Sequence, residues 1–305
     1  MAAVVSHRPA QVSDQAKSRH GSAWLVSGLC ILAAGLVLNT ALGPLISGTI
    51  RYHYAESLTN QGIAVDAVAL IAALIAVVAA SLVRNQRPIG PVLAFVPATF
   101  AAYMAPQYVV GPDYLGLPGN NEQFFLLHIA LLVVATAVIL TAWRSIDPDL
   151  LVPRSATSDR RRSWVMVGLA AFIALGRWLP SVLDLMSGQP SLPEYLDNPT
   201  AHLLIGTLDL GLVVPAALAA AVGLRVGARW GRTSAYALIG WFALVPASVA
   251  AMSITMQINN DPNANSAMTA FFVAAACAFT AGGLLLYRPL FRATEGEVLD
   301  LGKLP

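Results

Sequence analysis

Charged residues are scarce in this 305-residue sequence. Asp, Glu, Lys and Arg make up 11% of the chain, against about a quarter in ordinary soluble domains, while hydrophobic residues make up 57%. This composition excludes an ordinary soluble domain and predicts several membrane-spanning segments. The net charge of +2 is spread over separate segments, so the sequence does not predict nucleic-acid binding.

Cysteine is almost absent. Cys30 and Cys277 are the only two, both lie in long apolar segments, and no CxxC pair occurs. A redox dithiol and a cysteine-based zinc site are therefore not expected. Free cysteines usually behave as small apolar residues, so we expect both side chains to be buried.

Motifs typical of soluble enzymes are missing as well. The sequence has no GxxxxGK[ST] loop, no GxGxxG turn, no GxSxG elbow and no HxxxH or HExxH spacing. We therefore identify no catalytic residue and favour a non-enzymatic protein. An embedded acid–base enzyme that uses Asp209, His202 or Glu194 stays open.

Long apolar runs, in contrast, are abundant. Each is about 20 residues long, which is enough to cross a ~30 Å hydrocarbon layer. They are continuous and rich in Ala and Leu, which excludes the alternating strands of a membrane β-barrel. We predict an all-α polytopic helix bundle with eight transmembrane helices, near residues 23–45, 62–83, 89–110, 123–143, 163–186, 202–224, 233–257 and 268–287.

The positive residues predict the orientation. Of the 18 Lys and Arg residues, all except Arg51 and Arg177 fall in the two terminal segments and in the loops that follow the even-numbered spans. Because Lys and Arg are enriched in cytoplasmic loops, both termini are predicted to be cytoplasmic, in a multi-pass protein of the plasma (inner) membrane. The first 20 residues lack the apolar core of a signal peptide, so the first span is expected to be an uncleaved anchor.

Weak internal similarity divides the chain into two halves. WLVSGL at Trp24 resembles WVMVGL at Trp164, and LTNQ at Leu58 resembles LDNP at Leu196. Four spans per half would give both halves the same orientation, which predicts a parallel 4+4 internal repeat. The expected units are a cytoplasmic tail at 1–22, a first half at 23–143, a linker at 144–162, a second half at 163–287 and a second tail at 288–305.

Ionisable residues at a common depth predict the site. Counting ~1.5 Å per residue from the inner end of each helix puts Arg177, Asp209 and His128 at ~22–26 Å of a ~30 Å layer, in its outer third. Ionisable residues at such depth are functional candidates. The predicted ligand-binding residues are Arg177, Asp209, His128, Asp66, His202 and Gln107.

Two further patterns bear on the ligand. Arg177 and Asp209 lie on consecutive antiparallel spans at nearly equal depth, so we expect an ion pair, which could bind a ligand or merely join two helices. Clefts of one charge sign concentrate the opposite ion, so acidic outer loops favour a cationic ligand. These outer acidic residues are Glu56, Asp113, Glu122, Asp184, Glu194, Asp197 and Asp261.

No cofactor or metal is specified by the sequence. A haem between His128 and His202 is disfavoured, because helix counting puts the two at depths that differ by ~10 Å. A weak metal candidate at the outer face would combine His53, His128, His202, Glu194 and Asp197.

We therefore predict a protein of the lipid bilayer that binds or transports a small solute or cation at a polar pocket in the outer half of the membrane. Two alternatives stay open. One is a membrane-embedded enzyme or redox subunit. The other is an accessory or scaffold protein without a small ligand, whose partner is another membrane protein or a second copy of the chain.

Overall fold

The structure of the chain, a computed structural model, describes residues 9–151 and 156–292, and these ranges contain helices and no strands. Eight of the helices are long and apolar enough to cross a membrane, so the prediction of an all-α, eight-span bundle is confirmed. In chain order the elements are α1 (Pro9–Leu42), α2 (Glu56–Arg84), α3 (Ile89–Val110), η1 (Asn121–Phe124), α4 (Phe125–Ser145), η2 (Pro148–Leu150), α5 (Ala156–Ala171), η3 (Phe172–Trp178), α6 (Leu179–Met186), α7 (Pro193–Asp197), α8 (Pro199–Leu208), η4 (Asp209–Val213), α9 (Val214–Arg225), α10 (Arg229–Ile258) and α11 (Ser266–Arg292).

Several helices are longer than expected, including those of spans one and two. The helix of span two starts at Glu56 rather than at residue 62, and α1 begins at Pro9, so helix already covers part of the expected tail at 1–22. Residues 1–8 and 293–305, which belong to the two expected tails, lie outside the described residues.

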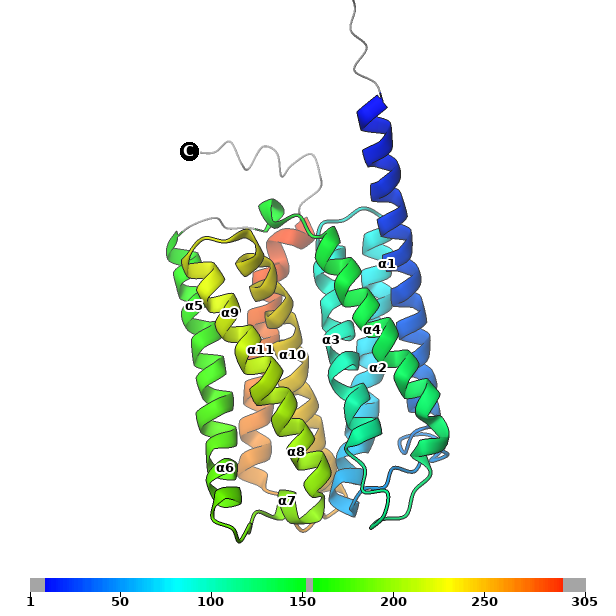
Figure 1. The fold of residues 1–305 in the computed structure, drawn as a ribbon, viewed down its shortest axis with the longest axis vertical. Coiled ribbons are helices and arrows are strands. Elements are labelled where there is room, and N and C mark those ends of the chain that lie inside the picture. The colour runs from blue at the N-terminus through cyan, green and yellow to red at the C-terminus, as the bar shows by residue number, and fades with distance from the viewer. Residues whose placement is uncertain (1–8, 152–155, 293–305) are drawn as a thin grey trace, which may run out of the picture.

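The first four spans form a closed ring. Helix α1 packs on α2 and on α4, and α3 packs on α2 and α4 in turn (Figure 1). The buried face of α2 consists largely of alanines. Lipid is as apolar as these side chains, so the hydrophobic effect does not drive helices together in a membrane, and small residues stabilise the bundle by letting helices pack closely. These alanines are Ala64, Ala69, Ala72, Ala73, Ala76, Ala79 and Ala80.

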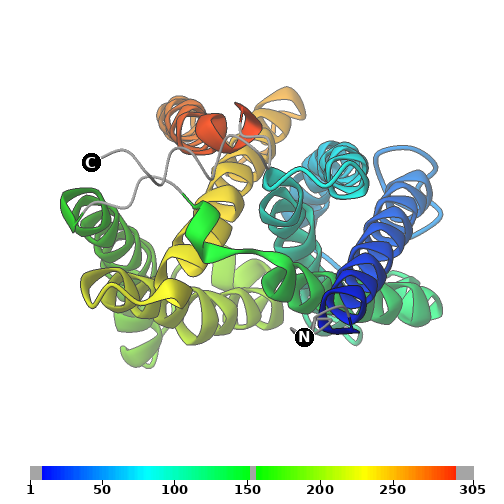
Figure 2. The same ribbon diagram turned by 90° about the horizontal axis from the view of Figure 1, so that it is seen from above.

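Helix α10 joins the two halves. It packs against α2 and α3 of the first half and against α9 and α11 of the second, and it crosses the middle of the bundle in Figure 2. In the first half α1 closes the ring on α4, whereas α5 and α11 make no comparable contact in the described chain. The 4+4 repeat therefore stays a prediction.

Arginines gather at one end of the bundle, where α1 begins and α11 ends (Figure 1). We call this the arginine-rich end and the opposite one the distal end. Here Arg229 Nη2 lies 2.6 Å from Asp149 Oδ2, and Arg232 Nε lies 3.1 Å from the buried Asp159 Oδ2. The long loop before α5 is thus fastened to the start of α10.

The expectation of buried cysteines was wrong. Cys30 and Cys277 are both exposed, because they lie on helix faces that turn away from the bundle. In a membrane such faces meet lipid, which is as apolar as a protein core, so a small apolar residue is equally suited to either place.

Helices α9 and α10 come closest at two glycines near the arginine-rich end. A Cβ atom on Gly231 would collide with the backbone of Gly223, and a Cβ on Gly223 would lie 2.7 Å from the Cα of Gly231. Only glycine permits this backbone contact.

We predict that Gly231→Ala lowers the thermal unfolding midpoint of the detergent-solubilised protein. The methyl group would push the two backbones apart, which costs about 1–3 kcal/mol as overpacking does elsewhere. Gly168→Ala on α5 is the matched control, since nothing lies within 4 Å of its Cβ position and alanine favours helix. Equal midpoints for the two variants would contradict this account.

Candidate functional site

Spans five and six both contain a short π-helical stretch. These stretches are η3 (Phe172–Trp178) and η4 (Asp209–Val213), and they contact each other in the distal half of the bundle. A π-helical turn uses i→i+5 hydrogen bonds, so it rotates the following residues relative to an α-helix, and such turns are frequent at functional sites.

The predicted ion pair between Arg177 and Asp209 was wrong. Trp178, at the end of η3, faces Asp209, while Arg177 points outward with 43% of its side chain exposed and its Nη2 2.6 Å from Glu194 Oε2. Its guanidinium also lies over the Trp178 ring, 4.9 Å from the centroid. Equal depth did not decide which side of span five faces Asp209, and in the structure the π-helical stretch ends with Trp178 rather than Arg177 toward Asp209.

Neutral donors hold the carboxylate of Asp209. Tyr103 Oη donates to Oδ1 at 2.8 Å, and Trp178 Nε1 donates to Oδ2 at 2.8 Å. Gly206 makes room for the indole, since a Cβ there would lie 2.9 Å from it. Asp209 therefore ties α3 to both π-helical stretches.

Another pair of side chains lies farther toward the distal end of the same spans. His202 Nε2 is 2.6 Å from Ser181 Oγ, and His202 Nδ1 is 4.0 Å from Glu194 Oε2. Ser181 and His202 are 1% and 4% exposed, so the pair is enclosed.

Asp66 lies in the other half of the molecule, inside the closed ring. Its side chain is 1% exposed, and Oδ2 accepts one hydrogen bond, from the backbone N–H of Leu45 at 3.3 Å. Gly43 lies directly against this oxygen, and its missing side chain leaves the space. The ion pairs among the described residues include none to Asp66.

His128 lies in the same ring and is completely buried. Its Nε2 is 3.2 Å from Asn39 Oδ1 and 3.5 Å from Tyr52 Oη, while its Nδ1 has no hydrogen-bond partner in the described chain. The rings of Tyr52 and Tyr108 lie 5.9 and 5.2 Å from the imidazole. This buried group, which we call the first-half cluster, comprises Asn39, Tyr52, Asp66, Tyr108 and His128.

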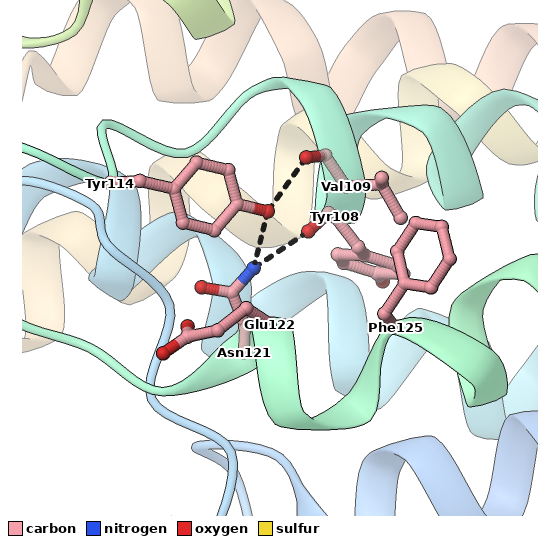
Figure 3. A pocket seen from close by; sticks show the side chains of 6 residues that line it. All are labelled: Tyr108, Val109, Tyr114, Asn121, Glu122 and Phe125. Atoms are coloured by element: carbon pink, nitrogen blue, oxygen red, sulfur yellow. Dashed lines mark hydrogen bonds between the residues drawn. The ribbon is translucent and has the colours of Figure 1, made fainter.

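A pocket of about 370 Å³ opens at the distal end next to this cluster. Its lining combines aromatic rings with one amide and one carboxylate, and Figure 3 shows the amide of Asn121 donating to the carbonyl of Tyr108 at 2.9 Å and to the hydroxyl of Tyr114 at 3.1 Å. Tyr108 belongs to both the pocket and the cluster. The lining residues are Tyr108, Val109, Tyr114, Asn121, Glu122 and Phe125.

His53 holds the rim of this pocket together. Its Nε2 lies 2.9 Å from Glu122 Oε2, and its Nδ1 contacts the carbonyl of Leu117. Burial alone would lower the pKa of His53, but the Leu117 carbonyl and the Glu122 carboxylate together raise it above the ordinary value.

The predicted site residues thus separate into two groups. Asp66 and His128 belong to the first-half cluster, whereas Arg177, Asp209 and His202 lie in the second half. Gln107 lies on α3. Its side-chain Nε2 donates to the backbone carbonyl of Tyr103 at 3.1 Å, and its backbone carbonyl accepts a hydrogen bond from the hydroxyl of Tyr54 at 2.6 Å. Binding of a ligand by these residues stays a prediction.

The outer acidic residues do not form one open rim. Asp261 is buried and accepts from Asn60 at 2.9 Å, and Asp184 accepts from the backbone N–H of Ser191 at 2.9 Å. Nor do the described residues bring three or more His, Cys, Asp or Glu side chains into a group that could hold a metal ion. The five-residue metal set is therefore wrong.

Several residues that contact these groups were not identified from the sequence. Asn39, Tyr103 and Ser181 are single polar residues within apolar runs, and no motif surrounds them. An Asn in the last turn of the first span was a usable signal, because a buried amide needs a hydrogen-bond partner.

We predict that Tyr103→Phe destabilises the protein more than Arg177→Met. The first change removes only the hydroxyl that donates to Asp209, which leaves a partly buried carboxylate oxygen short of a donor and costs about 1–3 kcal/mol. The second breaks an exposed ion pair, worth about 1 kcal/mol or less. Thermal unfolding midpoints in one detergent would measure both, and the reverse order would support the original ion pair instead.

We also predict that the contribution of His53 to stability falls as the pH rises from 6 to 8. Protonated His53 stabilises the folded rim, and because its folded pKa is raised above the unfolded value of about 6.5, this contribution is complete below that pH and is lost through the folded pKa. The change in unfolding midpoint from pH 6 to pH 8 should therefore be more negative in the wild type than in His53→Gln. An equal change in the two proteins would contradict this role of His53.

Comparison with known proteins adds no family to this description. No protein-family model, no curated protein and no solved structure matches the chain.

Proposed function

We propose that the protein binds a small cation at the first-half cluster and carries it, alone or together with a small solute, across the membrane. The carboxylate of Asp66 would neutralise the cation, and the distal pocket would admit it. The observation that carries the proposal is a 1% exposed carboxylate without an ion pair in the described chain, at membrane depth.

The free-energy cost of that carboxylate supports a bound positive charge. An ionised Asp costs about 3 kcal/mol at the centre of a membrane helix on insertion scales and less toward its ends. Asp66 lies nearer the distal end of α2, but it is buried, and a single hydrogen bond from Leu45 does not offset desolvation of two oxygens. A proton or a metal or organic cation would remove the net charge. Asp209 differs, because two side chains already donate to it.

A chain of polar side chains leads from the pocket to His128, another member of the first-half cluster. The ring of Tyr108 lines the pocket and stacks on the ring of Tyr52 with centroids 5.2 Å apart. The hydroxyl of Tyr52 lies 3.5 Å from Nε2 of His128, and Nδ1 of this histidine has no hydrogen-bond partner among the described residues. Aromatic faces and a nearby Glu122 carboxylate attract cations, organic ones included.

The proposal also specifies the orientation of the protein in the membrane. The arginine-rich end would face the cytoplasm of a plasma (inner) membrane, because Lys and Arg are retained on that side. The distal pocket would then open to the exterior, as expected for uptake. A partner protein or a second copy remains an alternative for the lipid-exposed faces of α11, such as Phe271 and Leu285.

We predict that a cation stabilises the wild-type protein and that Asp66→Asn abolishes this effect. A ligand that binds only the folded protein adds about 2.7 kcal/mol of stability at 100 times its dissociation constant. Thermal unfolding would be followed in LiCl, NaCl, KCl and tetramethylammonium chloride at one ionic strength, and as a function of pH for the proton. Proteoliposomes tested for cation-driven current would measure transport.

Four variants make this test specific. Asp149→Asn removes a carboxylate at the arginine-rich end and should leave the cation effect intact, as should Asp209→Asn even if it lowers the midpoint. Gly43→Ala places a methyl group against Asp66 Oδ2 and should weaken the cation effect, whereas Gly62→Ala, whose Cβ would meet only Pro44 at 3.9 Å, should not. Identical cation responses in wild type and Asp66→Asn would reject the proposal.

A further inference from the structure

We propose that Ser181, His202 and Glu194 form a second site that hydrolyses an ester with a long acyl chain. Three separate elements supply the residues: α6, α8 and α7. The site shares no residue with the first-half cluster, so it does not depend on the cation proposal.

The two nitrogens of His202 have different neighbours. Nε2 is 2.6 Å from the Ser181 hydroxyl and Nδ1 is 4.0 Å from the Glu194 carboxylate. A nucleophile, a base and an acid in this order are the arrangement that activates a serine, and the distances are often loose before substrate binds. Trp178 and Tyr195 contact the imidazole edge to face, at 5.1 and 5.9 Å, and so fix its plane.

Two neighbours complete the arrangement. Arg177 holds Glu194 through a 2.6 Å contact and is therefore a positioning residue. Asn198 lies one helical turn before His202, is completely buried, and its amide nitrogen has no hydrogen-bond partner in the part of the chain that the structure describes. Such an unused donor suits the negative oxygen that develops on a substrate carbonyl.

The reaction balances with water as the only co-reactant. Ser181 Oγ forms a bond to the ester carbonyl carbon and gives its proton to His202 Nε2. The bond from that carbon to the alcohol oxygen then breaks, and the leaving alcohol takes this proton. A water molecule next attacks the acyl-serine and gives a proton to His202, which returns it to Ser181 Oγ as the free acid leaves.

The position of the site indicates a substrate that lies in the bilayer. Ser181 belongs to a membrane span, and the apolar residues around it face outward: Leu183 is 59% exposed and Met186 is 78% exposed. An acyl chain could lie along these side chains while its ester group, at the depth of a headgroup junction, reaches the serine. Ser181 is itself 1% exposed, so access requires that the short helix α7 (Pro193–Asp197) move aside.

An alkyl fluorophosphonate tests the proposal directly, because it modifies activated serines. The full chain in lipid nanodiscs would be treated with the probe, and the modified residue identified by peptide mass mapping. In the wild type we expect the probe to modify Ser181, and in Ser181→Ala we expect no modification at this position. In His202→Gln the modification of Ser181 should be about 100-fold slower, because the general base is lost. Arg177→Met should slow labelling and shift its pH dependence without abolishing it.

The exposed Ser187 is the internal control, since it lies at the end of the same helix without a histidine partner in the described chain. Hydrolysis of long-chain and acetyl p-nitrophenyl esters then tests the substrate class, and faster turnover of the long-chain ester supports a bilayer substrate. No label on Ser181, or a rate equal to that of Ser187, would overturn the proposal and leave the Ser181–His202 contact as helix packing. Because wild-type mapping decides, a misfolded variant would not obscure the result.

Discussion

A carboxylate inside a hydrocarbon layer must find its hydrogen-bond donors or counter-charge within the protein, and the two embedded aspartates meet this constraint differently. Asp209 receives one donor on each oxygen, from Tyr103 and Trp178. Asp66 receives only the N–H of Leu45 on one oxygen, although it is the more deeply buried of the two. The first aspartate is satisfied by the fold, whereas the second is left with one donor in the described chain, and this difference is the reason why we propose ligand binding at Asp66 and not at Asp209.

The π-helical stretch η3 decides which side chains of span five face the protein. Trp178 and Ser181 are three residues apart, share one helix face and are both buried, while Arg177 is turned outward. One local change of helical pitch therefore supplies the donor to Asp209 and the partner of His202. It also leaves Arg177 free to hold Glu194.

Much of the fold could be predicted from the sequence, because it depends on a coarse physical property. Twenty apolar residues suffice to cross a bilayer, whichever side chains they are, so eight spans follow from composition and length. Depth was also within reach, since it follows from counting along a helix. Asp66, His128 and Asp209 were selected on that basis, and each one does lie among polar partners.

Side-chain direction was out of reach, because it depends on helix pitch and on neighbours from other spans. No sequence signal in 172–178 indicates a π turn, and matched depth alone suggested that Arg177 could reach Asp209. Ser181 and His202 lie 21 residues apart on spans five and six, and no sequence motif links them. Counting along a helix gives the depth of a residue but not the side of the helix on which it lies. Residues of similar depth from both halves were therefore assigned to a single pocket, although the structure separates them into two groups.

The asymmetry between the halves has a consequence for how molecules could enter them. Contacts between α1 and α4 close the first ring, so a molecule that approached Asp66 from the lipid would have to separate two packed helices. In the described chain α5 and α11 make no comparable contact, so parting these helices would break little packing. A substrate in the bilayer would therefore meet less resistance on its way to Ser181 than on its way to Asp66.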